Sequence, residues 1–428
     1  MMAVPRKAHV NITYTKKVKA GAAKNKKRTA TVMREYLEGF TYTDPATGES
    51  DTISLQVLNI DLRWANKWIP KKKDTMVAKI VTNSWTKSGK KKTFNCGKFC
   101  VDDLSFSGPT LSCTIGGVST PEGNAFRSTE RSKTWKDITL KELARNIASK
   151  YHMKLIYTGP VIKIGTLEQS TETDCSFLNK ICSDYAMAIK VYSGKVVIFD
   201  KGVYEARKAV ATINKANILD WSYNSTLTGT YTGATIKYTA GDDDKELECK
   251  VGSGKRILSI NEKVDNLADA QLKACGKVNT ENEKAVTMSI SIMANTRIAA
   301  GSTVKITGLY KLNGKYFVDK VTHKIEAESA YTMDLELHKC QKRIKPAAAA
   351  AAPAASAAAS TALAVGDRVT VNGPAYYGGN GGRANQCKGM TMYITQILGG
   401  SYKYKYGVAK RKGGTRYGWC EESSLTKA

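Results

Sequence analysis

The sequence predicts a mainly β protein with an α+β insertion and a small β-barrel tethered at the C-terminal end. Three observations support this fold class. Apolar residues alternate with polar ones in two long regions, as in half-buried strands, and between these regions the apolar spacing changes to that of helices. An alanine- and proline-rich segment then precedes a last region that is rich in glycine and tyrosine. The predicted domains are a first β region at 1–121, an α+β region at 122–204, a second β region at 205–345, a linker at 346–364 and the C-terminal barrel at 365–428.

The first β region contains strands with clear alternation. In HVNITYT (9–15) the apolar side chains of Val10, Ile12 and Tyr14 fall on one face. The stretch FCVDDLSFSG (99–108) also indicates a strand, and it places Asp102 and Asp103 side by side. Successive strand residues point to opposite faces, so two such carboxylates do not attend one bond as a glycosidase pair does. We interpret this stretch as architecture.

The α+β region begins with a helix pattern. In TLKELARNIASKY (139–151) apolar residues recur at helical spacing, and Thr139 with Glu142 forms a capping-box pattern. A second helix is expected over 175–185, with Asp174 as its cap, followed by a hairpin over 187–200. These elements predict a small α+β unit.

The second β region returns to strand patterns and is interrupted by one predicted helix at 266–281. LNGKY (312–316) contains Asn-Gly, a strong hairpin signal.

In the C-terminal region, SYKYKYG (401–407) predicts a strand with three tyrosines on one face and lysines on the other. The linker between them combines helix-favouring alanine with an interrupting Pro353, which predicts a semi-rigid spacer.

Charge, targeting signals and cysteine content indicate the class of partner and the cellular compartment to expect. The chain has 66 Lys and Arg against 38 Asp and Glu, a formal net charge of +28, which favours acidic partners. No signal peptide and no run of 18 apolar residues occurs, so we expect synthesis and folding in the cytoplasm without a membrane span. The ten cysteines are interpreted as mostly reduced core residues, because disulfides are rare in cytosolic proteins. A metal site is not expected either, since Cys96 and Cys100 have no matching second Cys or His pair downstream.

Catalytic patterns are not found. The four histidines end at His338, so the C-terminal Gly-Trp-Cys (418–420) has no histidine base in its own region. The P-loop, Gly-x-Ser-x-Gly and His-Glu-x-x-His patterns are also missing, and GDDDKE (241–246) does not match a calcium loop. The sequence therefore predicts no catalytic residue, no cofactor and no metal site, and the protein is not expected to be an enzyme.

Three stretches in series resemble the late control D / baseplate hub family of contractile phage tails and R-type bacteriocins. They are KFCVDDLSFSGPTLSCTIGG, FRSTERSKTWKDITLKELARNIASKYHMKLIY and SFLNKICSDYAMAIKVYSGKVVIFD, and the resemblance extends over roughly residues 5–345. It implies two tube-like β-barrels per chain, flanking the small α+β unit. It also implies a homotrimer whose partners are the tail tube protein, the spike protein and other baseplate subunits.

The C-terminal region is similar to bacterial Src-homology-3-like barrels of cell-wall enzymes and phage tail proteins. That resemblance implies contact with peptidoglycan, since aromatic faces stack on sugars and lysines attract anionic wall groups. The alternative for each aromatic residue is a place in the small core. The candidate wall- or partner-binding residues are Tyr376, Tyr377, Tyr402, Tyr404, Tyr406 and Trp419.

These observations lead to a structural hub as the first hypothesis, in a particle that is assembled in the bacterial cytoplasm and acts outside it. A peptidoglycan-degrading tail lysin is the alternative from another class, and the missing catalytic patterns argue against it. A nucleic-acid-binding protein is suggested by charge alone, without a reading motif. The sequence leaves open whether the particle is a DNA-carrying phage or a headless bacteriocin (a tailocin), and whether the barrel binds wall or a baseplate subunit.

Overall fold

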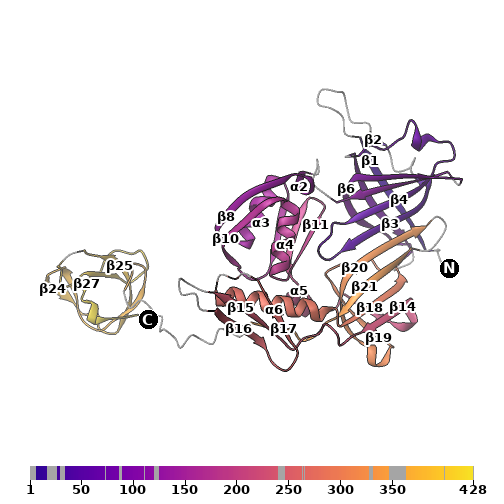
Figure 1. Ribbon diagram of the computed structural model, residues 1–428. Coiled ribbons are helices and arrows are strands. Elements are labelled where there is room, and N and C mark those ends of the chain that lie inside the picture. Colours follow the sequence, from indigo (N-terminus) through magenta and orange to yellow (C-terminus); the bar gives the residue numbers. More distant parts are fainter. Residues whose placement is uncertain are drawn as a thin grey trace. The chain divides into compact units, whose positions relative to one another are not determined.

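A computed structural model gives the fold (Figure 1). It describes residues 6–16, 27–28, 34–72, 74–85, 89–109, 111–119, 125–239, 246–262, 264, 266–326, 331–346, 363–399 and 401–427. The chain forms two compact units, residues 1–347 and 348–428, which are described separately. Most of the predicted linker and of the acidic stretch 241–246 lies outside the described residues.

The first β region contributes seven strands to a large, mostly antiparallel sheet of the first unit. Strand β1 buries Val10, Ile12 and Tyr14, as the alternation predicts. A 3-10 turn, η1 (Arg63–Ala65), follows the fourth strand. The hydrogen-bonded order is β3-β4-β7-β6-β5-β1-β2. The strands are β1 Lys7–Thr15, β2 Lys27–Arg28, β3 Leu37–Pro45, β4 Thr52–Leu58, β5 Thr75–Asn83, β6 Lys91–Ser107 and β7 Ser112–Val118.

The second β region forms the rest of this sheet in the order β13-β19-β20-β21-β18-β14. Its two outer strands, β13 and β14, are consecutive in the chain and are joined by the three-residue turn η2 (Lys215–Asn217). So short a connection between opposite edges requires the sheet to curl back on itself. The strands are β13 Ala211–Asn214, β14 Ile218–Ser225, β18 Val286–Met293, β19 Thr303–Thr307, β20 Gly314–Glu326 and β21 Thr332–Lys339.

The two β regions share one sheet, because β20 pairs antiparallel with β3 from Lys320 opposite Pro45 to Glu326 opposite Gly39. The resulting 13-stranded order does not close into a ring within the described residues. One core contains side chains from both regions, including Leu55, Met76, Ile290 and Leu335. The predicted mainly β fold class is confirmed.

The predicted Asn-Gly hairpin exists, but its turn is longer than the sequence suggested. Strands β19 and β20 pair across the 3-10 turn η3 (Tyr310–Leu312), and Gly314 is the first residue of β20. The Asn313 side chain accepts a hydrogen bond of 2.7 Å from the Leu309 amide. This side-chain contact closes a wider loop than a two-residue turn would form.

The α+β region lies between the two β regions in sequence. The predicted capping box of α3 is present, since Glu142 N donates to Thr139 Oγ1 at 3.2 Å and Thr139 N donates to Glu142 Oε2 at 3.0 Å. Helix α4 begins one residue earlier than predicted, so Thr173 caps it rather than Asp174. Its elements are α2 Ala125–Ser128, β8 Glu130–Thr139, α3 Leu140–Lys150, β9 Lys154–Thr158, β10 Lys163–Thr173, α4 Asp174–Asp184, β11 Met187–Tyr192, β12 Lys195–Asp200 and α5 Lys201–Ala206.

Helix α6 (Leu267–Glu283) does not pack on the large sheet, although the sequence placed it within the second β region. Its small side chains Ala270 and Ala274 pack with Ile236 and Val251 of a separate three-stranded sheet. That sheet has the order β16-β15-β17, from β15 Gly233–Thr239, β16 Glu246–Gly252 and β17 Ile257–Ile260. No described helix is long and apolar enough to cross a membrane.

The second unit is a seven-stranded antiparallel sheet in the order β24-β23-β27-β26-β25-β22-β28. The predicted strand at 401–407 is wrong for most of its length, because β26 begins only at Tyr406, and 402–405 form no strand. The strands are β22 Arg368–Val371, β23 Ala375–Gly378, β24 Gly381–Asn385, β25 Met390–Ile397, β26 Tyr406–Ala409, β27 Gly418–Cys420 and β28 Leu425–Lys427, with the turn η4 at Glu422–Ser424.

Candidate functional site at the junctions of the first unit

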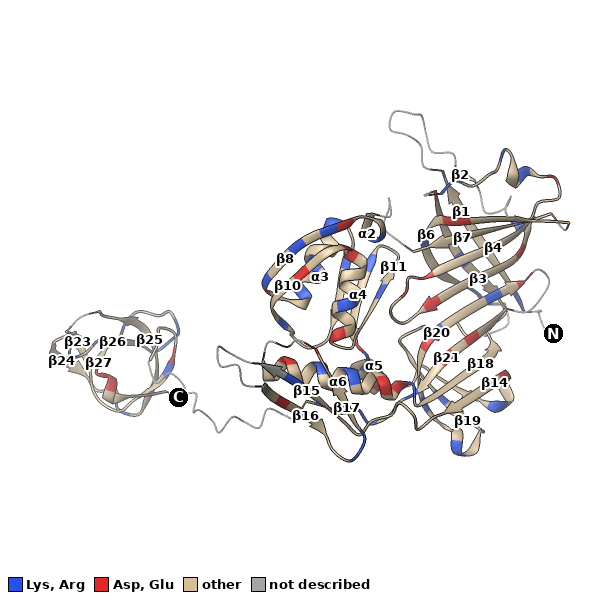
Figure 2. Ribbon diagram, in the orientation of Figure 1, with Lys and Arg blue, Asp and Glu red and all other residues tan. Residues whose placement is uncertain are grey.

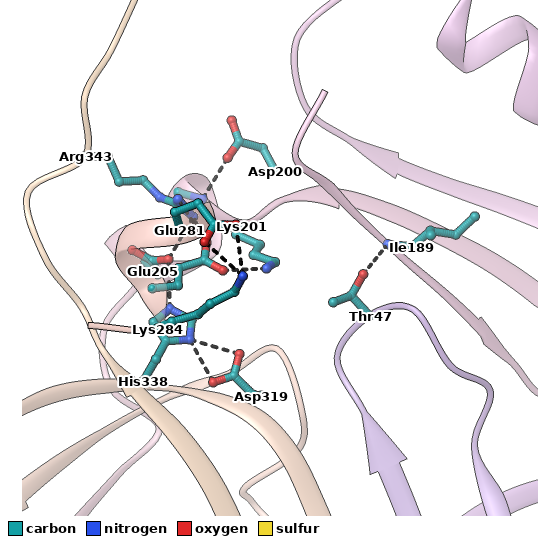
Figure 3. A network of polar contacts seen from close by, with 12 residues as sticks. Thr47, Ile189, Asp200, Lys201, Glu205, Glu281, Lys284, Asp319, His338 and Arg343 are labelled. Carbon is teal, nitrogen blue, oxygen red and sulfur yellow. Dashed lines mark hydrogen bonds and ion pairs between the residues drawn. The ribbon is translucent and has the colours of Figure 1, made fainter. Parts of the chain in front are cut away.

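Buried charges are concentrated where helix α5 and the C-terminal end of α6 lie near strands β20 and β21 (Figure 3). His338 of β21 is the centre of this group and is 3% exposed. Its Nδ1 lies 2.7 Å from Oδ2 of Asp319 on β20, and its Nε2 lies 3.2 Å from Oε1 of Glu205 on α5. Burial alone would lower the pKa of His338, but the hydrogen bonds to the two carboxylates outweigh it and raise that pKa to about 9. His338 is therefore a buried cation at neutral pH.

Two further cations complete the group. Arg343, which follows β21, donates to Glu283 at the end of α6 at 2.7 Å and lies 3.0 Å from Glu205. Lys201, the first residue of α5, donates to the second oxygen of Glu283 at 2.6 Å. Three cations thus face three carboxylates, and each carboxylate has a cationic partner. We name these six residues the His338 network: Lys201, Glu205, Glu283, Asp319, His338 and Arg343.

The donor atoms of Glu205, Glu283 and His338 lie within 4.8 Å of one another, which makes them a candidate metal-ligand group. The chemistry of the group does not fit a metal ion. A histidine ligand must be neutral, and His338 is protonated with both ring nitrogens engaged by carboxylates. The Glu283 oxygens are engaged by Arg343 and Lys201. We assign the group as an ion network that links α5 and the C-terminal end of α6 to β20, β21 and the segment after β21.

A second buried group joins the α+β region to the first β region. Lys190 of β11 forms ion pairs with Asp44 of β3 and with Asp51, at 3.0 Å for Asp51 Oδ1. Tyr42 donates to the other oxygen of Asp51 at 2.6 Å. Burial raises the pKa of Asp51 to about 7, even though Lys190 acts to lower it. One cation therefore serves two buried carboxylates in this Lys190 group, defined as Tyr42, Asp44, Asp51 and Lys190.

Backbone contacts reinforce the same junction. The Ile189 amide donates to Thr47 Oγ1 at 3.1 Å (Figure 3). The Ile189 carbonyl accepts from Gly48 N at 3.1 Å. Asp44 Oδ2 also accepts from the Ala300 amide of the second β region at 3.0 Å. Asp44 thus contacts all three regions of the first unit, which fixes their relative positions.

Asp102 and Asp103 lie on β6 and are both exposed, where the register with β7 shifts between Val101 and Asp103. All ten cysteines lie within the described residues as thiols, and seven of them are buried. The thiol of Cys420 is buried, and burial raises its pKa to about 12, so it is a poor nucleophile.

The predicted aromatic residues of the second unit are placed in two environments. Tyr377 is 59% exposed and Tyr402 is 43% exposed. The rings of Tyr376 and Tyr404 stack with centroids 4.0 Å apart. Tyr406 and Trp419 are buried in the unit, at 6% and 5% exposure, so their side chains are occupied by packing. The structure thus leaves Tyr376, Tyr377, Tyr402 and Tyr404 as the candidate surface residues.

The two buried charge groups were not found by sequence reasoning. The residues of each group are far apart in the chain, since Glu205 and His338 are separated by 133 positions and Asp44 and Lys190 by 146. A signal existed for His338 alone, because histidine is rare in this sequence. The alternation of Met333, Leu335 and Leu337 on β21 places His338 on the opposite face, so the strand pattern predicts neither its burial nor its carboxylate partners.

Parts of the sequence are similar to a family model and to known phage proteins. Residues 128–338 match a family model described as YQBQ-like. The chain is 28% identical over 155 residues to the probable baseplate hub protein of Escherichia phage P2, covering 35% of this chain and 40% of that protein. It is 26% identical over 163 residues to the probable baseplate hub protein of Escherichia phage 186, covering 37% and 42%. The matched stretch thus spans about two fifths of the length of these relatives.

Two solved structures share the fold. The tail protein from Neisseria meningitidis MC58 has a TM-score of 0.55 at 12% identity, covering 78% of this chain and 96% of that one. The 43 kDa tail protein of prophage MuSo2 from Shewanella oneidensis has a TM-score of 0.56 at 11% identity, covering 77% and 98%. The first unit therefore shares its fold with these two tail proteins. In sequence, the chain is similar to baseplate hub proteins.

Proposed function

We propose that this chain is a structural hub protein of a contractile injection particle, either a phage tail or a tailocin. In this role it joins the six-fold tail tube to the three-fold spike as a homotrimer, and it is a component of the extracellular particle. The observation that carries the proposal is the pairing of β20 with β3, which unites two β regions of one chain in a single sheet. Three such chains would offer six β regions to the tube while keeping three-fold symmetry for the spike.

The buried charge groups support a hub role, because a hub that transmits force needs its regions held in fixed positions. The Lys190 group and the His338 network each join elements from different regions of the first unit. Removing one partner from such a buried pair leaves an uncompensated charge, which is costly. The relative positions of the regions are thus strongly specified.

The test is electron microscopy of the purified native particle, with the chain located by an antibody fragment against the second unit. We expect three copies at the end of the tube, next to the spike. A location elsewhere in the particle, or a copy number other than three, would contradict the proposal.

For the second unit we propose a binding role toward cell wall, with Tyr376, Tyr377, Tyr402 and Tyr404 as contact residues. Exposed tyrosines can stack on sugars, and Lys403 lies 5.4 Å from the Tyr404 ring centroid, which adds a positive charge. The test is co-sedimentation of the full chain with purified cell walls. Tyr402→Ala should weaken it, whereas Tyr310→Ala, a tyrosine of the first unit that is 91% exposed, should not. Binding that is equal for both variants would favour a baseplate subunit as the partner.

The alternative function is a peptidoglycan-degrading tail lysin. A zymogram of the purified full chain distinguishes the two, since a clearing band would identify a lysin. The carboxylates of the His338 network and the Lys190 group are buried and ion-paired, which favours the structural role.

A further inference from the structure

A pocket of about 500 Å³ opens in the α+β region between β8, α3, β10 and the start of α4. Figure 2 shows Lys and Arg along β8 and on α3, around this position. The lining contains three basic and two acidic side chains, a net charge of +1. Its polar and aromatic lining includes Arg131, Lys133, Trp135, Asn146, Lys150 and Asp174.

Asp174 does not provide an open acceptor in this pocket. Its Oδ1 accepts from Gln169 at 2.8 Å, and its Oδ2 accepts from Lys150 at 2.7 Å and from the Tyr151 hydroxyl at 2.6 Å. Burial acts to raise the pKa of Asp174, but these hydrogen bonds outweigh it and hold the pKa below its usual value. Asp174 is therefore an ionised carboxylate whose oxygens are already satisfied.

The remaining polar groups are mostly donors. The indole Nε1 of Trp135 is buried and has no hydrogen-bond partner among the described residues. The Nε of Arg131 lies 3.5 Å from Asp174 Oδ2 and likewise makes no hydrogen bond within the described part of the chain. Lys133 lies over the Trp135 ring, 3.7 Å from its centroid. A buried donor without an acceptor is costly, so a ligand that supplies acceptor oxygens would be favoured here.

The ligand class follows from this balance. A carboxylate is a planar, singly charged acceptor that suits a guanidinium and an adjacent N–H donor. Its charge matches the net +1 of the lining, whereas a phosphate monoester would bring a larger negative charge than the lining compensates. The pocket is also larger than one carboxylate, so the group is carried on a larger molecule.

The neighbouring strand indicates what that molecule is. Among the described residues β8 pairs with β10 alone, so its other edge can offer backbone N–H and C=O groups to an added strand. We propose that the pocket and the β8 edge bind an extended segment of another protein, which places an Asp or Glu side chain against Arg131, Lys133 and Trp135. This inference does not depend on the hub role proposed above.

The test uses the full chain labelled with ¹⁵N in its tryptophan indoles, with the Trp135 resonance assigned from Trp135→Phe. The probe is the peptide acetyl-Thr-Val-Glu-Val-Thr-amide, and its matched control has Gln in place of Glu. We expect a saturable shift of the Trp135 resonance, with the Glu peptide binding about tenfold more tightly than the Gln peptide, the effect of one charge-assisted hydrogen bond. Equal binding of both peptides, or no shift with either, would overturn the proposal.

Matched variants locate the effect. Lys133→Met removes a pocket charge and should weaken binding of the Glu peptide about five- to tenfold, a loss of roughly one charge-assisted contact. Lys136→Met removes an exposed charge from the same strand outside the pocket and should leave binding unchanged. Poly(glycerol phosphate) tests the other source of anionic groups. Tighter binding of this polymer than of the Glu peptide would overturn the assignment to a protein segment.

Discussion

His323 on β20 and His338 on β21 lie on neighbouring strands of one sheet and are 0% and 3% exposed, but their surroundings differ. His323 stacks on Tyr42 with ring centroids 5.5 Å apart, and its Nδ1 lies 2.6 Å from the Tyr331 hydroxyl. Burial in this aromatic environment lowers the pKa of His323 to about 4. His338 faces the carboxylates of Asp319 and Glu205, and its pKa is about 9.

The comparison shows that partners, rather than burial, decide the charge of a buried histidine here. The two histidines should therefore affect stability in opposite directions as the pH changes. The lowered pKa of His323 gives stability that is present above pH 6.5 and lost as the pH falls through about 4. The raised pKa of His338 gives stability that is present below pH 6.5 and lost as the pH rises through about 9.

The largest expected effect is that of removing Lys190, the cation that pairs with Asp44, a carboxylate that acts on His323. In Lys190→Met, Asp44 and Asp51 would remain buried without their cation, which should reduce the free energy of unfolding of the first unit by about 3–5 kcal/mol. The uncompensated Asp44 should also raise the pKa of His323, making the two histidines more alike. Calorimetry measures the stability, and the His323 side-chain NMR signal measures the pKa.

The control is Lys154→Met, which removes an exposed lysine from β9 of the same three-stranded sheet as Lys190. Its transition temperature should remain close to that of the unchanged chain, because exposed charges contribute little. If Lys190→Met were equally mild, the Lys190 group would not be a stabilising junction.

The next effect concerns His338 itself. His338→Gln removes the cation from between Asp319 and Glu205 and should cost about 2–4 kcal/mol at pH 7. The unchanged chain should lose roughly 3 kcal/mol between pH 6.5 and 9, and the variant should lose little over that interval. Urea unfolding across this pH range measures both quantities. A variant with the same alkaline slope would show that His338 is not the titrating group.

A smaller change in the free energy of unfolding is expected for a substitution of His323, the histidine in the aromatic environment. His323→Phe keeps the ring but leaves the Tyr331 hydroxyl without its partner, which should cost about 1–2 kcal/mol at pH 7. The unchanged chain loses roughly 3 kcal/mol of the His323 contribution between pH 6.5 and 4, so the difference between the two proteins should reverse sign on acidification, with the variant the more stable at pH 4. His152→Asn, at an exposed position with positive φ, serves as the control for both histidine variants. A constant difference across this range would contradict the low pKa of His323.

The sequence predicted those parts of the fold that local spacing encodes. The alternation of Val10, Ile12 and Tyr14 identified a strand and its buried face, and Thr139 with Glu142 identified a helix start. These patterns connect residues two to four positions apart. The pairing of β20 with β3 and the separate sheet under α6 depend on contacts across hundreds of residues or on small side chains without a distinctive period, so they were not predicted.

The candidate sites were harder to predict for the same reason. Composition identified the aromatic residues of the second unit, but it did not separate the exposed Tyr402 from the buried Tyr406 and Trp419. That distinction depends on where β26 begins, and the alternation in SYKYKYG suggested too early a start. The charged junctions depend on distant partners, which a single sequence does not identify.

The smallest expected effect is at Asp102 and Asp103, which provide an exposed counterpart to the buried pair of Asp44 and Asp51. Both carboxylates are exposed to water, so the repulsion between them contributes little to stability. The single variants Asp102→Asn and Asp103→Asn should therefore change the free energy of unfolding by less than about 0.5 kcal/mol. Calorimetry and copy number in assembled particles are the measurements. Intact assembly with loss of a measurable hydrolytic activity in either variant would show that this acidic pair has a chemical role. Unchanged behaviour would show that in this protein acidic pairs become important where they are buried against a cation, as Asp44 and Asp51 are against Lys190.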